Sequence, residues 1–233
     1  MEPELHTNPA VIRTGAGGMA LEQQRVLRNT YLLLALTMVP TVIGAMAGIA
    51  TGGIIMQHPI ISTFLMLGAC IGLQFAIAAN RDSGLGVALL LLMTLLLGWF
   101  LGPLLAIALT LKNGPQLIAL AAGGTGAIFV VMAGVATTVK KDFSFMGKFL
   151  FVGMIVLLLA MLANLFLQIP ALALTISALV IVVFSLFLLH DVSRIVNGGE
   201  TNYIMAATGV YMSLFNIFAN LLQLLMELTG DRD

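Results

Sequence analysis

Asp191 is the residue of this sequence best suited to chemistry inside a membrane. It lies in an apolar stretch that ends near Val196, so a helix there would hold the carboxylate about 8 Å inside its end. A carboxylate at that depth must find a partner or take up a proton. Arg194, on the same helical face, is the nearest candidate partner, whereas His190 adjoins Asp191 and consecutive helical residues do not face each other. The pattern predicts either an interfacial ion pair or a titratable latch near one mouth of a pathway.

A second group of polar residues follows a helical repeat near the C-terminus. Its members are Ser213, Asn216, Asn220, Gln223 and Glu227. In a helix they form one stripe about 80° wide, and such a stripe is unfavourable against lipid. This helix should therefore contact several others, and its amides would either hydrogen-bond helix to helix or line a polar pathway. Glu227 belongs to the membrane face opposite Asp191, so the two carboxylates cannot share a site.

The residues needed for catalysis or metal binding are not arranged for it. No G-x-S-x-G, H-E-x-x-H or phosphate-binding loop occurs, and Cys70 is the only cysteine. The three histidines, His6, His58 and His190, are scattered. An intramembrane aspartyl protease would need two facing aspartates, and only Asp191 lies within an apolar stretch. We therefore predict no enzyme activity, metal or cofactor.

The composition indicates a protein whose surface faces lipid. Sixty per cent of the 233 residues are hydrophobic and only 9% are charged, whereas a soluble domain carries roughly 25% charged residues. The net charge is zero and no basic run occurs, which gives no support to nucleic-acid binding. The N-terminus does not resemble a signal peptide, because Glu2 and Glu4 come first and apolar sequence begins only near Thr30.

Seven stretches are long enough to cross a bilayer, which needs about 20 apolar residues. The predicted spans are Thr30–Ala50, Pro59–Ala79, Gly84–Leu109, Pro115–Thr138, Phe149–Gln168, Ala171–Val196 and Tyr203–Leu228. Short links join them, so neighbouring helices run antiparallel. We predict an all-α membrane protein with a seven-helix domain at 30–228, a disordered tail at 1–29 and a short C-terminal segment at 229–233.

The Lys and Arg residues indicate the orientation. Eight of the ten fall in the tail or at the second, fourth and sixth links, and Lys112 and Arg232 fall on the other side. The positive-inside rule therefore predicts a cytoplasmic N-terminus and a noncytoplasmic C-terminus. Small residues four apart let helices approach closely in lipid, and three such pairs occur: Gly44/Gly48, Gly68/Gly72 and Gly98/Gly102.

Five runs of the sequence resemble the bacterial branch of the Bax-inhibitor family, over a region from about Val26 to the C-terminus. They are Leu27-Arg-Asn-Thr-Tyr, Lys140-Lys-Asp-Phe-Ser-Phe, Asn164-Leu-Phe-Leu-Gln-Ile-Pro, Gly198-Gly-Glu-Thr-Asn-Tyr-Ile and Tyr211-Met-Ser-Leu-Phe-Asn-Ile-Phe. The resemblance implies a bacterial inner-membrane protein in which six helices surround a central seventh.

The resemblance also bears on the two polar groups. Family members that resemble calcium-leak channels carry two aspartates that share a proton and latch the pore. Asp191 matches the first of them, Ser213 stands where the second carboxylate would be, and Asn216 matches a family asparagine. Half of the latch is absent, so the two-carboxylate mechanism cannot operate here as such.

Two hypotheses of function follow. The first, which the resemblance implies, is a regulatory protein that binds and modulates a membrane-anchored, ATP-dependent, FtsH-like protease and its associated membrane proteins. It would also be a slow substrate that the protease grips by the tail. The alternative is a calcium or proton leak channel with Asp191 near the cytoplasmic mouth. Flux through proteoliposomes, compared with co-purification of a protease, would distinguish them.

Overall fold

The computed structural model describes residues 9–139 and 143–230, and their side chains from residue 21 to 139 and from 143 to 229. Within these ranges the structure is helical. The elements are α1 (Pro9–Thr51), α2 (Gly53–Gln57), α3 (Pro59–Ala79), α4 (Gly84–Thr110), α5 (Gly114–Thr138), a 3-10 turn (Ser144–Met146), α6 (Gly147–Leu167), α7 (Pro170–Val196) and α8 (Tyr203–Gly230). Seven helices in the described ranges are long and apolar enough to cross a membrane, which confirms the predicted fold class.

The helix ends follow local sequence signals. Prolines in the first turn begin α3, α5 and α7, where their missing N–H group needs no partner. Gly198, which follows the end of α7, adopts a φ of 76°, a left-handed conformation that glycine reaches without steric strain.

The N-terminal region differs from the prediction. Residues 1–29 were expected to be disordered, but α1 begins at Pro9, while residues 1–8 lie outside the described ranges. Residues 19–28 consist largely of strong helix formers, and no proline interrupts the chain between Pro9 and Pro40. Val26 packs against Ile195 and Ala206, so the folded bundle includes part of the segment assigned to the tail.

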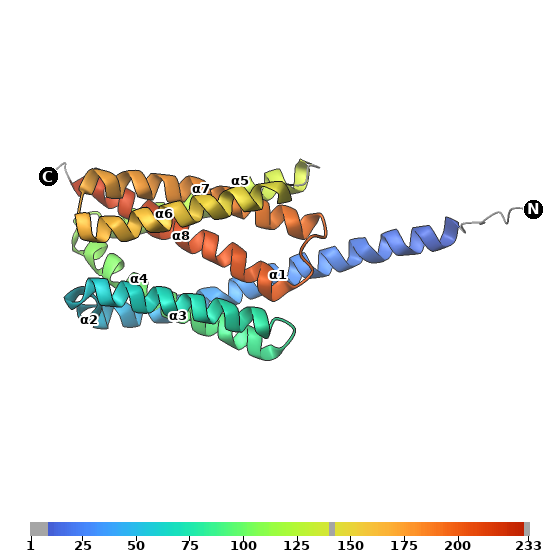
Figure 1. Cartoon of the computed structure of the whole chain (residues 1–233), viewed down its shortest axis with the longest axis horizontal. Helices are drawn as coiled ribbons and strands as arrows, with labels where there is room; N and C mark the ends of the chain where they lie inside the picture. Colours follow the sequence, from blue (N-terminus) through green and yellow to red (C-terminus); the bar gives the residue numbers. More distant parts are fainter. Residues whose placement is uncertain (1–8, 140–142, 231–233) are drawn as a thin grey trace, which may run out of the picture.

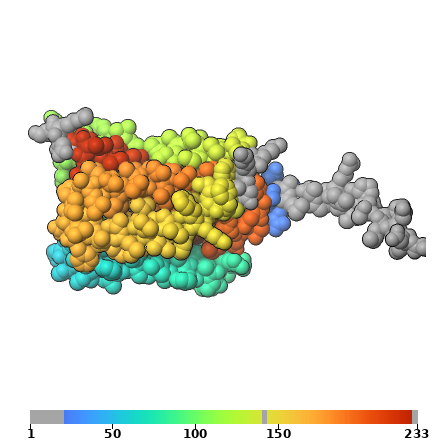
Figure 2. Space-filling model, turned by 45° about the horizontal axis from the view of Figure 1, so that its top comes forward, coloured from blue at the N-terminus to red at the C-terminus, as the bar shows by residue number. Residues whose placement is uncertain are grey.

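Helix α8 contacts α1, α3, α4, α5 and α7, consistent with a central position in the bundle (Figure 1). Its first half contributes Ala207, Val210 and Tyr211 to the largest cluster of buried residues. Helix α6 packs mainly on α7 and not along α8. Figure 2 shows the flank of the bundle on which α6 and α7 pack against each other.

Glycines allow α1 and α4 to pack very closely. A Cβ atom at Gly44 or Gly48 would collide with the backbone of α4, and one at Gly98 or Gly102 would collide with the backbone of α1. These two predicted pairs therefore form one helix contact. Gly68 and Gly72 behave differently, because a Cβ atom at either would meet nothing within 4 Å.

Candidate functional site

Asp191 pairs with its neighbour in the chain and not with the predicted partner. His190 Nδ1 lies 3.0 Å from Asp191 Oδ1, and the side chains are only 10% and 20% exposed. Arg194 instead contacts Glu200 Oε2 at 3.2 Å and donates to the Gly199 carbonyl oxygen at 3.1 Å. The predicted Asp191–Arg194 pair is therefore wrong.

Two glycines on neighbouring helices explain why His190 and Asp191 meet. A Cβ atom at Gly147 of α6 would lie 2.7 Å from His190 Nε2, and one at Gly209 of α8 would lie 2.7 Å from Asp191 Oδ2. The imidazole and the carboxylate each pack against a backbone without a side chain, so both turn along the surface of α7 toward each other. The rule for consecutive helical residues describes the directions of Cβ atoms, and tertiary packing overrides it here.

Ser213 lies one helical turn beyond Gly209 on α8 and is 2% exposed. Among the described side chains, His190 is the only hydrogen-bonding or ionic partner of Asp191. The arrangement joins a carboxylate to an imidazole, so it differs from two carboxylates that share a proton. The titratable latch at Asp191, Arg194 and Ser213 stays a prediction, but its predicted contact between Asp191 and Arg194 is absent from the structure.

Three links meet at the same end of the bundle as Asp191. Asn202 accepts bonds from the Ile204 and Met205 amides and so caps α8. Its amide donates to the Arg81 carbonyl oxygen and to Asp82 Oδ1, at 2.9 and 2.8 Å. The Phe143 N–H donates to Ser193 Oγ of α7. Sequence reasoning missed Asn202, although an asparagine directly before an apolar helix is a capping signal.

Tyr211 forms an interhelical hydrogen bond that the sequence did not indicate. Its side chain is 1% exposed, and its hydroxyl lies 2.8 Å from Thr41 Oγ1 of α1. A buried phenol usually needs such a partner. The bond joins α8 to the same turn of α1 that packs against Gly98.

The predicted polar stripe of α8 is not uniform. Ser213 is buried and Glu227 is exposed, while Asn216, Asn220 and Gln223 line a cavity. Asn216 Nδ2 donates to the Met212 carbonyl oxygen at 2.8 Å, and Asn220 Nδ2 donates to the Asn216 carbonyl oxygen at 2.9 Å. Within the described part of the chain, these amides bond their own helix and do not bond another helix.

The cavity consists of two adjoining hollows of about 390 and 490 Å³. The larger one lies between α3, α4, α6 and α8 and is mainly apolar. The smaller one lies between the first turn of α3, the end of α6, the start of α7 and α8. Met161, Leu165, Asn220 and Gln223 line both, so the two hollows are direct neighbours.

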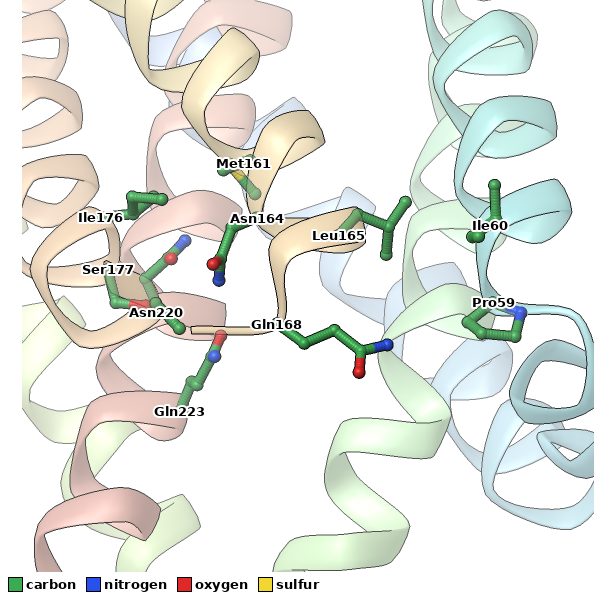
Figure 3. Close-up of a pocket in the computed structure, with 11 residues that line it drawn as sticks. Pro59, Ile60, Met161, Asn164, Leu165, Gln168, Ile176, Ser177, Asn220 and Gln223 are labelled. Atoms are coloured by element: carbon green, nitrogen blue, oxygen red, sulfur yellow. The ribbon is translucent and has the colours of Figure 1, made fainter. Parts of the chain in front are cut away.

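Amides from two helices gather in the smaller hollow. Figure 3 shows the amide groups of Asn164, Asn220 and Gln223 on one side of it, with the Gln168 side chain extending toward Pro59. Gln168 caps α6 in a left-handed conformation, with a φ of 53°. This site is a recess in which four amide side chains meet within an otherwise mainly apolar lining.

The fold and this recess define a polytopic helical membrane protein, and comparison with known sequences assigns its family. The family model described as inhibitor of apoptosis-promoting Bax1 matches residues 23–230. The chain therefore belongs to the Bax-inhibitor family, as the five runs had suggested.

Relatives match over nearly their whole length. An uncharacterized membrane protein of Vibrio cholerae is 41% identical over 93% of this chain and 96% of its own. The modulator of FtsH protease YccA from Escherichia coli K12 is 40% identical over 88% of this chain and 91% of its own. An uncharacterized protein of Campylobacter jejuni is 36% identical over 85% and 87%, respectively.

Proposed function

We propose that this protein binds and modulates an FtsH-like, membrane-anchored, ATP-dependent protease in a bacterial inner membrane. The observation that carries the proposal is the 40% identity to the modulator of FtsH protease YccA, which extends over 88% of this chain. Identity over that length extends across most of the helical bundle and is not confined to an isolated motif. The proposal describes a regulatory protein and assigns it no catalysis.

The orientation follows from charge. Links two, four and six meet at one end of the bundle through the Asn202 and Ser193 contacts, and Arg81, Lys148 and Arg194 lie at or near these links. We propose that this end is cytoplasmic. A reporter that is active only in the cytoplasm should work after residue 29 and fail after residue 233. The reverse result would contradict the orientation.

The structure limits which part of the N-terminus a protease could grip. A Cβ atom at Gly198 would lie 2.6 Å from Gln23 Nε2, and Val26 packs with Ile195. Residues from Gln23 onward therefore belong to the folded bundle, which resists extraction because each span would leave hydrocarbon for water. We propose that the protease engages the segment before residue 19.

The test combines binding with degradation. The full-length protein should co-purify with the protease from native membranes, and the protease should cleave other membrane substrates more slowly when this protein is present. Deletion of residues 5–18 should lengthen the half-life of this protein in cells that contain the protease and leave it unchanged in cells without it.

A chain with residues 5–18 scrambled is the matched control, because it keeps length and composition. Equal half-lives for the full-length and shortened chains, in cells with and without the protease, would contradict a role for the tail as the grip. Absence of both co-purification and inhibition would overturn the proposed function.

A further inference from the structure

The cavity beside α8 opens sideways, on the outer surface of the bundle. Its rim includes Ile60 of α3 and Met161 of α6, which are 40% and 44% exposed. Helices α3 and α6 flank this opening and do not pack against each other along their length. In a bilayer, the opening faces the hydrocarbon chains of lipid, near the end of the bundle where α3 begins and α6 ends.

The polar part of the cavity carries hydrogen-bonding capacity that the protein does not use. Asn220 is 8% exposed, and its Oδ1 has no protein partner among the described residues. Asn216 Oδ1 also has no protein partner among the described residues. Neither the oxygen nor the nitrogen of the Gln168 and Gln223 side-chain amides has one there. Unpaired amides inside a membrane are unfavourable, so these groups are suited to a ligand that both donates and accepts.

The residue types that line the cavity limit the class of ligand that it can bind. Among the described residues, no Asp, Glu, Lys, Arg or His lines either hollow, so a charged head would be desolvated there without a counter-charge from them. The larger hollow continues away from the amides between apolar side chains such as Leu67, Phe100 and Leu158. The cavity is therefore amphipathic, with most of its amides toward one membrane face and, apart from Asn216 and Thr63, apolar side chains in the rest of the larger hollow.

The size of the cavity suits a small molecule. From Met212 to Gln223 it follows α8 for about 16 Å, and its two hollows have volumes of about 390 and 490 Å³. Small-molecule sites have volumes of about 300–1,000 Å³.

Gln168 adds an independent indication at the mouth of the cavity. It is the only residue other than glycine with a positive φ in the described ranges. A left-handed conformation is unfavourable for such a residue by about 1 kcal/mol, and here it directs the amide across the opening (Figure 3). Strained backbone of this kind is concentrated at binding sites.

We propose that this cavity binds an uncharged amphiphile from the noncytoplasmic leaflet. The ligand has one hydrocarbon chain in the larger hollow and a hydroxyl or ester head on the amides of Asn220, Gln223 and Gln168, like the glycerol-ester part of a membrane lipid. The site does not depend on a protease partner, so its test is separate from that of the proposed function, and only the choice of leaflet rests on the proposed orientation.

Cys70 makes the test possible without engineering, because the only cysteine of the chain lines the larger hollow. Monoolein and oleate share one chain and differ in the charge of the head. With delipidated full-length protein at mildly alkaline pH, monoolein should slow the alkylation of Cys70 by N-ethylmaleimide. It should also form a one-to-one complex in native mass spectrometry, and oleate should do neither.

Variants locate the head. Asn220→Leu and Gln223→Leu should each weaken monoolein binding about tenfold, the effect of about one lost hydrogen bond. Gln116→Leu is the matched control, since Gln116 is an exposed amide in the first turn of α5 that does not line the cavity. It should bind monoolein as the unmodified chain does.

Mass spectrometry of the protein with its retained ligand identifies which amphiphile occupies the cavity. Protein extracted mildly from membranes should retain either a two-chain lipid or a single-chain amphiphile, and both have the proposed head chemistry. Equal protection of Cys70 by monoolein, oleate and octadecene would overturn the proposal, as would unchanged monoolein binding in both leucine variants. If the variants fail to fold, the protection of Cys70 by monoolein, oleate and octadecene in the unmodified chain still tests the proposal.

Discussion

The two sides of α8 are built differently. Toward α1 and α4, Tyr211 is fully enclosed and bonded to Thr41, and glycines bring the two outer helices into backbone contact. Toward α3 and α6, amides line a lateral cavity and bond only their own helix. Polar residues on one helix thus hold the bundle together on one side and remain available to a ligand on the other.

The largest expected effect is on the closed side, at Gly98. A methyl group there would collide with the Thr41 carbonyl oxygen, and backbone cannot move aside as a side chain can. Gly98→Ala should lower the free energy of unfolding by about 1–3 kcal/mol, the usual effect of overpacking. Equilibrium unfolding in mixed micelles would measure it.

Gly72→Ala is the control for that substitution. A Cβ atom at Gly72 would meet nothing within 4 Å, and alanine is a better helix former than glycine. Its stability should be unchanged or slightly raised. Equal losses for the two variants would contradict the contrast between the α1–α4 contact and the face of α3.

A smaller effect is expected from the Tyr211 hydroxyl. Tyr211→Phe removes its bond to Thr41 at 2.8 Å and leaves the ring in place. The free energy of unfolding should fall by about 1 kcal/mol. Thr41→Val in the same background should add little, because the only further bond that it breaks is the one from Thr41 Oγ1 to the Thr37 carbonyl oxygen of its own helix. Additive losses would show that the two hydroxyls act separately.

Gly209 tests the position of Asp191. Alanine there would displace the carboxylate, whose Oδ2 would lie 2.7 Å from the added Cβ. Gly209→Ala should be more destabilising with Asp191 present than in an Asp191→Ala background. A coupling of about 0.5–3 kcal/mol is typical of residues in contact. A coupling indistinguishable from zero would place the carboxylate elsewhere.

The smallest effect on the free energy of unfolding is expected on the side of α8 that faces α3, α6 and the cavity. Asn216 donates only to the Met212 carbonyl oxygen of its own helix, so Asn216→Leu should change the free energy of unfolding by no more than about 0.5 kcal/mol. A loss above that range would indicate a bond to another helix. The same equilibrium-unfolding measurement in mixed micelles, made beside that of Tyr211→Phe, compares the two sides of α8 directly.

The sequence alone was sufficient for the seven helices, their approximate ends and the family. Whether a segment crosses a bilayer depends on its own length and apolarity, and its ends depend on nearby proline, glycine and asparagine residues, so both are local properties. The beginning of α1 was misjudged because the charged, glycine-containing segment before residue 30 was taken as a reason for disorder. The cytoplasmic orientation remains a prediction from charge.

Only the tertiary structure decided which polar groups meet. The spacing from Ser213 to Glu227 placed them on one face of a helix, but not which of them would line a cavity. The exchange of Arg194 for His190 as the partner of Asp191 depends on Gly147 and Gly209, which lie on other helices. Likewise, glycine pairs with the same spacing bring α1 against α4 but leave Gly68 and Gly72 without such a contact. The rotation of each helix about its axis is set by contacts between residues distant in sequence, and a helical repeat read along one segment does not contain that information.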